Sequence, residues 1–469
     1  KSDDNLVNEK ILDEILVYFE ENKIFFENNE DYCKAIIRVF KRRLDIDSVI
    51  YYLNLFSNKN NPDTTSSLIY FNCFKKDWKQ EDFFKISKKL EEQFITYPGT
   101  KLVDIKINKK KKINIAFFSA DIRDSHSVTY FLKTLLSNYD KEKFNILLIS
   151  NNKIEDKTFD FFKKLIDKTI NIFEKNDIEA INIIRGYEID IIFDLMGVTS
   201  DHRLGLFKNR LAPVQISWCG YCNTTGLNQM DFIIADPNLV YKKEMNLYSE
   251  KIVFLPNIWN CHSGFNFKRI ENPPPYLKNK YITFGSFNNF RKINDDVVSV
   301  WSEILRKIQN SKLILKASDS ASTKMLLNKF KQHGVCDSIE FITYKKNFED
   351  HMNLYHKIDV ALDTFPYNGV TTSFEAIWMG VPVLTMKGYN FNSRCGESIN
   401  ANIDLNNFIA DNDKDYILKA LKLSQNYELL YETRKKLFDQ AISSPLFDEI
   451  NFRKNFFDLI TNIYKKKYN

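Results

Sequence analysis

The chain has 469 residues, too many for one compact core, and at ~150 residues per domain the length suggests about three structural units. Hydrophobic residues make up 44% of the chain and charged residues 27%, which is typical of a globular protein and argues against a disordered or membrane class. The net charge of +6 is spread among many acidic residues, so we expect no dedicated binding of nucleic acid.

Neither a long uninterrupted apolar run nor the apolar core of a signal peptide appears in the sequence. We therefore expect a cytoplasmic protein that does not associate with membranes. Its seven cysteines are an odd number scattered over a long chain, which indicates reduced thiols rather than a disulfide framework.

The first part of the chain has the periodicity of helices. From residue 5 to about residue 94, apolar pairs such as Ile15-Leu16 and Ile36-Ile37 recur at helical spacing. A break follows at residues 97–100, and the basic run Lys109–Lys112 is typical of a solvated linker. The pattern predicts an all-helical unit over residues 1–108.

From residue 113 short apolar runs alternate with longer amphipathic segments, which predicts parallel sheets covered by helices. The expected strands are Ile113–Phe118, Phe144–Ile149, Ile189–Leu195, Ile282–Phe287, Leu313–Leu315, Val360–Leu362 and Val383–Thr385. The proline-rich segment 271–275 interrupts the series. We therefore predict two doubly wound α/β domains, at residues 109–270 and 271–446, followed by a C-terminal helix at 447–469.

The sequence has no familiar nucleotide loop, because its 13 glycines form neither a Walker sequence nor a dinucleotide fingerprint. The best candidate for holding a nucleotide is the segment 362–372, a strand end that runs through a turn into the predicted helix Ser373–Met379. Backbone N–H groups and Thr hydroxyls at a helix N-terminus favour an anion such as a pyrophosphate. From this segment alone, simple helix capping by Thr371 or Thr372 is the stronger explanation.

A series of short motifs extends from about residue 65 to residue 465. In chain order the motifs are Ser119-Ala120-Asp121, His126-Ser127-Val128, Ala212-Pro213-Val214-Gln215, Gly220-Tyr221, Asn223-Thr224-Thr225-Gly226, Tyr248-Ser249-Glu250-Lys251, Phe284-Gly285-Ser286-Phe287-Asn288-Asn289 with Lys292-Ile293, Asp350-His351-Met352, Asp363-Thr364-Phe365-Pro366 and Ser443-Ser444-Pro445. The ordered set resembles the catalytic region of the SPINDLY-type protein O-fucosyltransferases and of their relatives, the O-GlcNAc transferases. The helical first unit then stands where these enzymes carry helical repeats.

The resemblance implies a GT-B fold, in which two Rossmann-like domains face each other across a cleft. It also implies an inverting glycosyltransferase that works without a metal or a cofactor and moves a sugar from a nucleotide sugar to Ser or Thr of a protein or peptide. The stretches around Glu375 and His126 are nearer to the fucosyl branch. GDP-fucose is therefore the first expected donor, and UDP-GlcNAc follows closely.

Several residues match positions to which the family assigns roles in donor binding. Lys292 matches a lysine that contacts the donor phosphates, where a cation stabilises the leaving diphosphate without a metal. His351 matches a histidine beside the nucleobase, and Glu375 matches a carboxylate beside the ribose. The implied donor site comprises Asn288, Lys292, His351, Asn368, Gly369, Thr371, Thr372 and Glu375.

His126 lies in the first strand-to-helix turn and is the candidate general base, with Asp121 and Asp194 as further candidates at strand ends. Together with Lys292 it makes up the predicted catalytic pair. The residues expected to face the acceptor and the cleft are Asp121, Gly197, Thr199, Thr224 and Thr225.

Two positions depart from the family pattern. The O-GlcNAc transferases have a histidine where Val370 stands, and both branches have a larger polar ring or a histidine where Val198 stands. Two further hypotheses therefore stay open: the same fold acting on a small molecule or an envelope glycan, and an inactive scaffold that binds partners.

The segment Cys219-Gly220-Tyr221-Cys222 has the spacing of a thioredoxin redox pair. A turn follows it where a redox helix would begin, and the six histidines supply no second pair of zinc ligands. We expect neither redox chemistry nor a metal site here.

Overall fold

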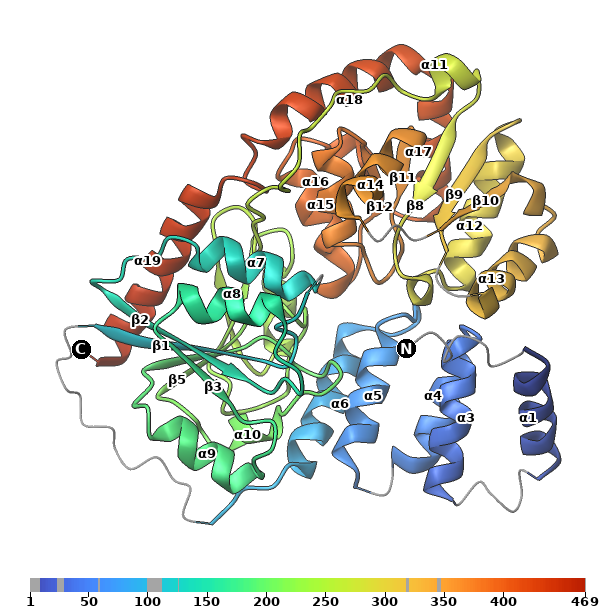
Figure 1. The fold of residues 1–469 in the computed structure, drawn as a ribbon. Coiled ribbons are helices and arrows are strands. Elements are labelled where there is room, and N and C mark those ends of the chain that lie inside the picture. The colour runs from blue at the N-terminus through green and yellow to red at the C-terminus, as the bar shows by residue number, and fades with distance from the viewer. Residues whose placement is uncertain are drawn as a thin grey trace.

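The structure is a computed structural model that describes residues 9–22, 29–57, 60–98, 112–124, 126–317, 320–343 and 347–468. Figure 1 shows a helical unit followed by two α/β domains. The expected boundary at residues 108–109 lies outside the described residues. None of the helices in these described ranges combines the length and the apolar character that crossing a membrane requires.

The N-terminal unit is helical, as predicted. Its helices are α1 (Glu9–Glu21), α3 (Glu30–Arg42), α4 (Ile46–Ser57), α5 (Pro62–Asn72) and α6 (Gln80–Gln93). They enclose a small core in which Ile36 and Val49 are fully buried. The unit binds the first α/β domain through polar contacts, because Gln80 donates to the Asn223 side chain at 2.8 Å and Lys208 donates to the carbonyl of Glu91 at 2.6 Å.

The first α/β domain is built on a seven-stranded parallel sheet in the order β3-β2-β1-β4-β5-β6-β7. The strands are β1 (Ile113–Ser119), β2 (Phe144–Ser150), β3 (Lys168–Asn171), β4 (Ile191–Asp194), β5 (Val214–Ser217), β6 (Phe232–Ala235) and β7 (Lys251–Phe254). The helices are α7 (Ser127–Leu136), α8 (Lys157–Leu165), α9 (Asp177–Arg185) and α10 (Gly205–Lys208). Figure 1 shows α7 and α8 on one face of the sheet and α9 and α10 on the other.

Both faces of this sheet are buried, which explains the continuous apolar runs. Ile115 and Phe117 of β1 belong to the core beneath α7 and α8, whereas Ala116 and Phe118 belong to the core beneath α9 and α10. Successive side chains of a strand point to opposite faces, so a strand covered on both sides favours apolar residues at most of its positions.

The second α/β domain repeats this arrangement with six parallel strands in the order β10-β9-β8-β11-β12-β13. The strands are β8 (Thr283–Ser286), β9 (Lys312–Lys316), β10 (Ile339–Ile342), β11 (Val360–Leu362), β12 (Val383–Met386) and β13 (Ile409–Ala410). The helices are α11 (Tyr276–Asn279), α12 (Asp295–Lys307), α13 (Ser320–Gln332), α14 (Phe348–Asn353), α15 (Thr371–Trp378), α16 (Cys395–Ala401), α17 (Asp413–Gln425) and α18 (Tyr427–Ala441).

Both sheets follow the Rossmann order 3-2-1-4-5-6, in which the order of successive strands reverses beside the first strand. In such folds ligands bind at the carboxyl ends of the two strands flanking this switch point, here β1 and β4 in one sheet and β8 and β11 in the other. The predicted fold class is confirmed. A ligand site is expected at the loops that follow these four strands.

The C-terminal helix α19 (Glu449–Tyr468) returns to the first α/β domain after the chain has completed the second (Figure 1). The ring of Phe457 packs on Phe144 with centroids 4.6 Å apart, and Phe456 packs on Trp218 at 4.9 Å. Arg453 donates to the carbonyl of Thr134 at 2.9 Å. The helix therefore joins the end of the chain to the first sheet.

We expect the substitution Phe456→Ala to lower the free energy of unfolding by about 3–5 kcal/mol, because it removes a fully buried ring from this junction. The measurement is urea-induced unfolding followed by circular dichroism. The matched control is Ile450→Ala on the same helix, where the side chain is 72% exposed and a change within about 0.5 kcal/mol is expected. Equal losses in both variants would contradict this account of the packing.

Candidate active site

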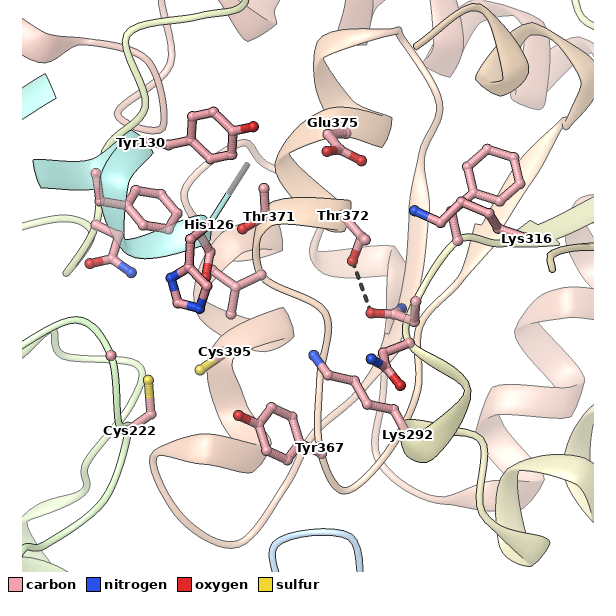
Figure 2. A pocket seen from close by; sticks show the side chains of 18 of the residues that line it. His126, Tyr130, Cys222, Lys292, Lys316, Tyr367, Thr371, Thr372, Glu375 and Cys395 are labelled. Atoms are coloured by element: carbon pink, nitrogen blue, oxygen red, sulfur yellow. Dashed lines mark hydrogen bonds between the residues drawn. The ribbon is translucent and has the colours of Figure 1, made fainter. Parts of the chain in front are cut away.

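A cavity of about 600 Å³ lies between the two α/β domains and receives side chains from both (Figure 2). Of the residues singled out in the sequence, it is lined by His126, Asn288, Lys292, His351, Thr371, Thr372 and Glu375. Six of these residues follow β1, β8 or β11, and His351 lies on α14, which follows β10, so the cavity opens at the carboxyl ends of the strands.

The loop after β11 is held in shape by Asp363. One carboxylate oxygen accepts hydrogen bonds from the backbone N–H groups of Thr364 and Gly369 at 2.9 and 2.7 Å, and the other accepts from the hydroxyl of Thr385 at 2.8 Å. Burial raises the pKa of the Asp363 carboxyl to about 6, against the effect of these donors. A Cβ at Gly369 would lie 2.5 Å from the hydroxyl of Thr372, so only glycine fits this turn.

This loop leads into helix α15, whose N-terminus faces the cavity without a side-chain cap. The N-cap residue is Val370, which makes no capping hydrogen bond, and Thr371 and Thr372 are the first two helical residues. The hydroxyl of Thr372 donates to the Asn288 side chain at 2.9 Å (Figure 2). Capping therefore does not account for the two threonines, and the positive end of the helix dipole is directed at the cavity.

Lys292 brings a positive charge to the same wall of the cavity. Its ammonium donates to the carbonyl of Asn368 at 2.8 Å and lies 4.4 Å from the ring centroid of Tyr367. Burial lowers the pKa of Lys292 to about 8, although the nearby Asp363 carboxylate opposes this shift. An anion in the cavity would stabilise the charged form, so this cation is poised to respond to one.

A second polar cluster lies at the other end of this wall. His351 Nε2 is 3.2 Å from the Glu375 carboxylate, and the hydroxyl of Tyr355 donates to the same oxygen at 2.8 Å. Burial alone would raise the pKa of Glu375, but the hydrogen bond and charge of His351, together with Lys316 and Tyr355, hold it below its usual value. The site thus keeps a buried carboxylate ionised beside an imidazole ring.

His126 occupies the opposite wall. It is the N-cap residue of α7, but its side chain makes no capping bond and instead lines the cavity (Figure 2). Its Nε2 lies 3.4 Å from the Asp121 carboxylate. Its Nδ1 is buried and has no hydrogen-bond partner within the part of the chain that the structure describes.

Burial of the ring lowers the pKa of His126, and the charge of Arg123 adds to this, whereas the carboxylate of Asp121 opposes it. The neutral imidazole is therefore favoured at neutral pH. If Asp121 holds the proton on Nε2, the neutral ring keeps the lone pair of Nδ1 as its proton acceptor.

Seven predicted residues do not line this cavity: Asp121, Gly197, Thr199, Thr224, Thr225, Asn368 and Gly369. The hydroxyls of Thr224 and Thr225 both donate to the buried Glu250. The N–H of Gly197 donates to Asp194 at 2.8 Å, and the hydroxyl of Thr199 donates to the carbonyl of Met196 at 2.8 Å. These hydrogen bonds hold the loops around the site in place.

Asp194, a further candidate for the base, is likewise occupied by the backbone N–H groups of Met196 and Gly197, and burial raises its pKa to about 6. Cys219 and Cys222 line the cavity as free thiols. In the described ranges no group of three or more His, Cys, Asp or Glu side chains is arranged to hold a metal ion.

Many residues that line or support the cavity were not among the predicted site residues, and these include Tyr130, Lys316, Tyr355 and Tyr367. Lys316 ends β9 at the same edge of the sheet as the predicted residues, so the rule of strand ends could have identified it. Tyr355 is brought to Glu375 by tertiary packing alone, which no local sequence pattern indicates.

The model of glycosyl transferase family 41 matches residues 90–265 and 275–456 of this chain. The chain belongs to this family. The resemblance noted in the motifs is thereby confirmed, as is the assignment to the glycosyltransferases. The two matched segments contain every residue that lines the cavity.

Among curated proteins, the chain is similar to the probable UDP-N-acetylglucosamine–peptide N-acetylglucosaminyltransferase SPINDLY of Arabidopsis thaliana, with 31% identity over 373 residues. The match covers 76% of this chain and 40% of that protein, so the chain spans about two fifths of the relative's length. The similarly named SEC protein of the same plant is 28% identical over 275 residues, which cover 56% of this chain and 28% of SEC.

Among solved structures, a mutant of the Thermobaculum terrenum O-GlcNAc transferase superposes with a TM-score of 0.86 and 26% identity, covering 93% of this chain and 84% of that one. A glycosyltransferase from Rickettsia africae superposes with a TM-score of 0.52 and 14% identity, covering 77% of this chain and 100% of that one. The second likeness reflects the fold alone.

We expect Asp121→Asn to lower the pKa of His126 further, because the negative charge that stabilises the imidazolium is removed. The measurement is the pH titration of the histidine ring protons by NMR. The other five histidines of the chain serve as internal controls and should keep their titration curves. A His126 curve unchanged by the substitution would show that the carboxylate and the ring do not interact.

Proposed function

We propose that this chain is an inverting glycosyltransferase that works without a metal and moves a sugar from a nucleotide sugar to a Ser or Thr hydroxyl of a protein. The observation that carries the proposal is the convergence of the Lys292 ammonium and the open N-terminus of α15 on one wall of the cavity between the domains. Such a wall fits the diphosphate of a nucleotide sugar.

The same wall supplies the electrostatic part of catalysis. When the bond between sugar and diphosphate breaks, negative charge develops on the leaving phosphate oxygen. The fixed dipole of α15 and the ammonium of Lys292 stabilise that charge more than they stabilise the intact donor, which lowers the barrier. These groups do the work that a divalent cation does in other transferases, so the proposal includes independence from metal.

The nucleoside fits the far end of the wall. The imidazole ring of His351 offers a face for a nucleobase, and the ionised Glu375 offers an acceptor for ribose hydroxyls, as acidic residues do in other nucleotide folds. The residues found in the motifs favour GDP-fucose as the donor. The names of the relatives instead specify UDP-N-acetylglucosamine. Both donors therefore belong in the test.

His126 is our candidate for the general base. It belongs to the first domain, whereas the proposed diphosphate site belongs to the second, so the two lie on facing walls of the cavity. An acceptor hydroxyl beside the ring would lose its proton to the imidazole and attack the anomeric carbon on the side away from the leaving group. Attack from that side inverts the configuration of the sugar.

We expect Lys292→Met to slow sugar transfer by about 10²–10³-fold and to weaken binding of the nucleoside diphosphate product, because the leaving group loses its cation. The measurements are transfer to a protein acceptor and calorimetric titration with GDP and UDP. The matched control is Arg291→Met, which changes the neighbouring exposed cation outside the cavity and should leave both properties unchanged. Transfer by Lys292→Met at the parent rate would refute the proposed role.

The affinity for the diphosphate should fall as pH rises through about 8, because Lys292 then loses the proton that the bound anion requires. Below that pH the ammonium is present and the affinity is at its plateau. Lys292→Arg carries a charge that persists across this range, so its affinity should depend less on pH. Calorimetry at constant ionic strength from pH 7 to pH 9 measures both profiles, and parallel profiles would contradict the assignment.

A panel of donors and acceptors distinguishes the remaining alternatives. Stabilisation by GDP but not UDP in a thermal-shift assay favours the fucosyl branch, and the reverse favours N-acetylglucosamine transfer. We expect transfer to peptides that contain Ser or Thr and none to free sugars. Transfer to free sugars alone would instead support a small-molecule or glycan acceptor, and indifference to every nucleotide would indicate a scaffold.

A further inference from the structure

The helical unit reaches the proposed donor site through the turn that follows α5. Phe74 in this turn is 2% exposed and stacks on the ring of Tyr367, with centroids 5.1 Å apart and planes inclined by 18°. Tyr367 belongs to the loop after β11 and contacts the Lys292 ammonium, which lies 4.4 Å from its ring centroid. Figure 2 shows this ring beside Lys292 at the edge of the cavity. One aromatic ring thus contacts both the helical unit and the lysine.

Asn294 makes a second connection two residues beyond Lys292. Its side-chain amide donates to the carbonyl of Phe74 at 2.9 Å and to the carbonyl of Phe365 at 3.0 Å. The amide oxygen of the same side chain caps α12 by accepting from Val297 at 2.9 Å. The helical unit, the loop after β11 and the segment that carries Lys292 therefore meet at one residue.

Further contacts fix the same junction. The hydroxyl of Tyr389 donates to the carbonyl of Lys75 at 3.0 Å, and the ammonium of Lys76 lies 2.5 Å from the carboxylate of Asp413. The turn after α5 is thus held on the second domain at several points rather than by one ring contact.

A lysine side chain has four rotatable bonds, so its ammonium stabilises a diphosphate only if neighbouring groups hold it in place. The carbonyl of Asn368 supplies one such group, and the ring of Tyr367 supplies a cation–π contact. The backbone of Tyr367 is fixed, since its carbonyl accepts from the Thr364 hydroxyl at 2.7 Å. The orientation of its ring depends on what packs against it, and Phe74 does so.

We propose that the helical unit positions the donor-phosphate lysine, with Phe74 and Tyr367 acting as positioning residues for Lys292. The inference rests on the proposed function and deepens it, because it makes the donor site depend on a unit outside both α/β domains. Any partner that shifts the turn after α5 changes the affinity for the donor, and the donor changes the affinity for that partner by the same factor.

A double-mutant cycle tests this coupling, using Phe74→Leu, Tyr367→Leu and the double variant. Calorimetric titration with GDP and with UDP measures the product affinity of each. Each single variant should weaken binding by about 3–10-fold, and the double variant should bind about as weakly as the weaker single one, since both act on one ring contact. Effects that multiply, or Phe74→Leu binding within about twofold of the parent, would overturn the proposal.

The matched control is Phe83→Leu, which removes a ring that is 1% exposed in α6 and packs on Trp78. This variant loses the same apolar volume from the helical unit without touching Tyr367, so its affinity for either nucleotide should equal that of the parent. If it weakens binding as much as Phe74→Leu does, the effect is a general loosening of the unit and the proposal fails.

A second readout needs no nucleotide. In protein labelled with ¹³C at lysine Cε, the titration of Lys292 reports its pKa in the free protein. Loss of the cation–π contact should lower that pKa in both Tyr367→Leu and Phe74→Leu, and Phe83→Leu should leave it unchanged. If the parent binds neither nucleotide the proposed function fails, whereas an unaltered Lys292 titration in Phe74→Leu overturns the positioning role by itself.

Discussion

The site depends on keeping a positive charge half-buried at the carboxyl ends of two parallel strands. An ammonium in such a place loses hydration, and the pKa of Lys292, lowered to about 8, reflects that loss. Asp363 stabilises the buried ammonium of Lys292 in two ways. Its charge opposes the shift, and its oxygens fix the turn whose Asn368 carbonyl accepts from Lys292. In the proposed function, a bound diphosphate would supply a further counter-charge, so the energetic cost of burial would be recovered when the donor binds.

Much of the architecture could be predicted because burial on both faces leaves a plain signal. The strands β1, β2, β9 and β11 are mostly apolar, and each lies within one residue of its expected position. Several of the missed strands had a weaker signal, although β6 (Phe232–Ala235) is apolar throughout and was missed as well. β3 and β7 lie at the edges of the first sheet and are partly exposed, and β5 contains the buried Gln215, whose amide donates to the Phe207 carbonyl at 2.9 Å. A buried polar residue with good partners looks like a loop residue in the sequence.

The site was predicted less completely, for a related reason. Small polar residues in a motif either face a ligand or hold the loop that does, and the spacing of the residues does not distinguish these roles. Thr371 and Thr372 line the cavity, whereas Thr224 and Thr225 bind the buried Glu250. The contribution of Phe74 was beyond local reasoning altogether, since it arises from packing across nearly 300 residues of chain.

The helical unit contacts both α/β domains. It meets the first domain at Asn223 and Lys208, and it meets the second at Tyr367 and Asp413. The first domain carries His126 and the second carries Lys292, so one unit contacts both of the domains whose residues we assign to deprotonation and to the leaving group. Misplacement of reacting groups by about 1 Å can lower the rate by about 10²-fold. A common support for the two domains would help to keep these groups in place. Under the proposed function, the unit would therefore belong to the catalytic framework together with the two sheets.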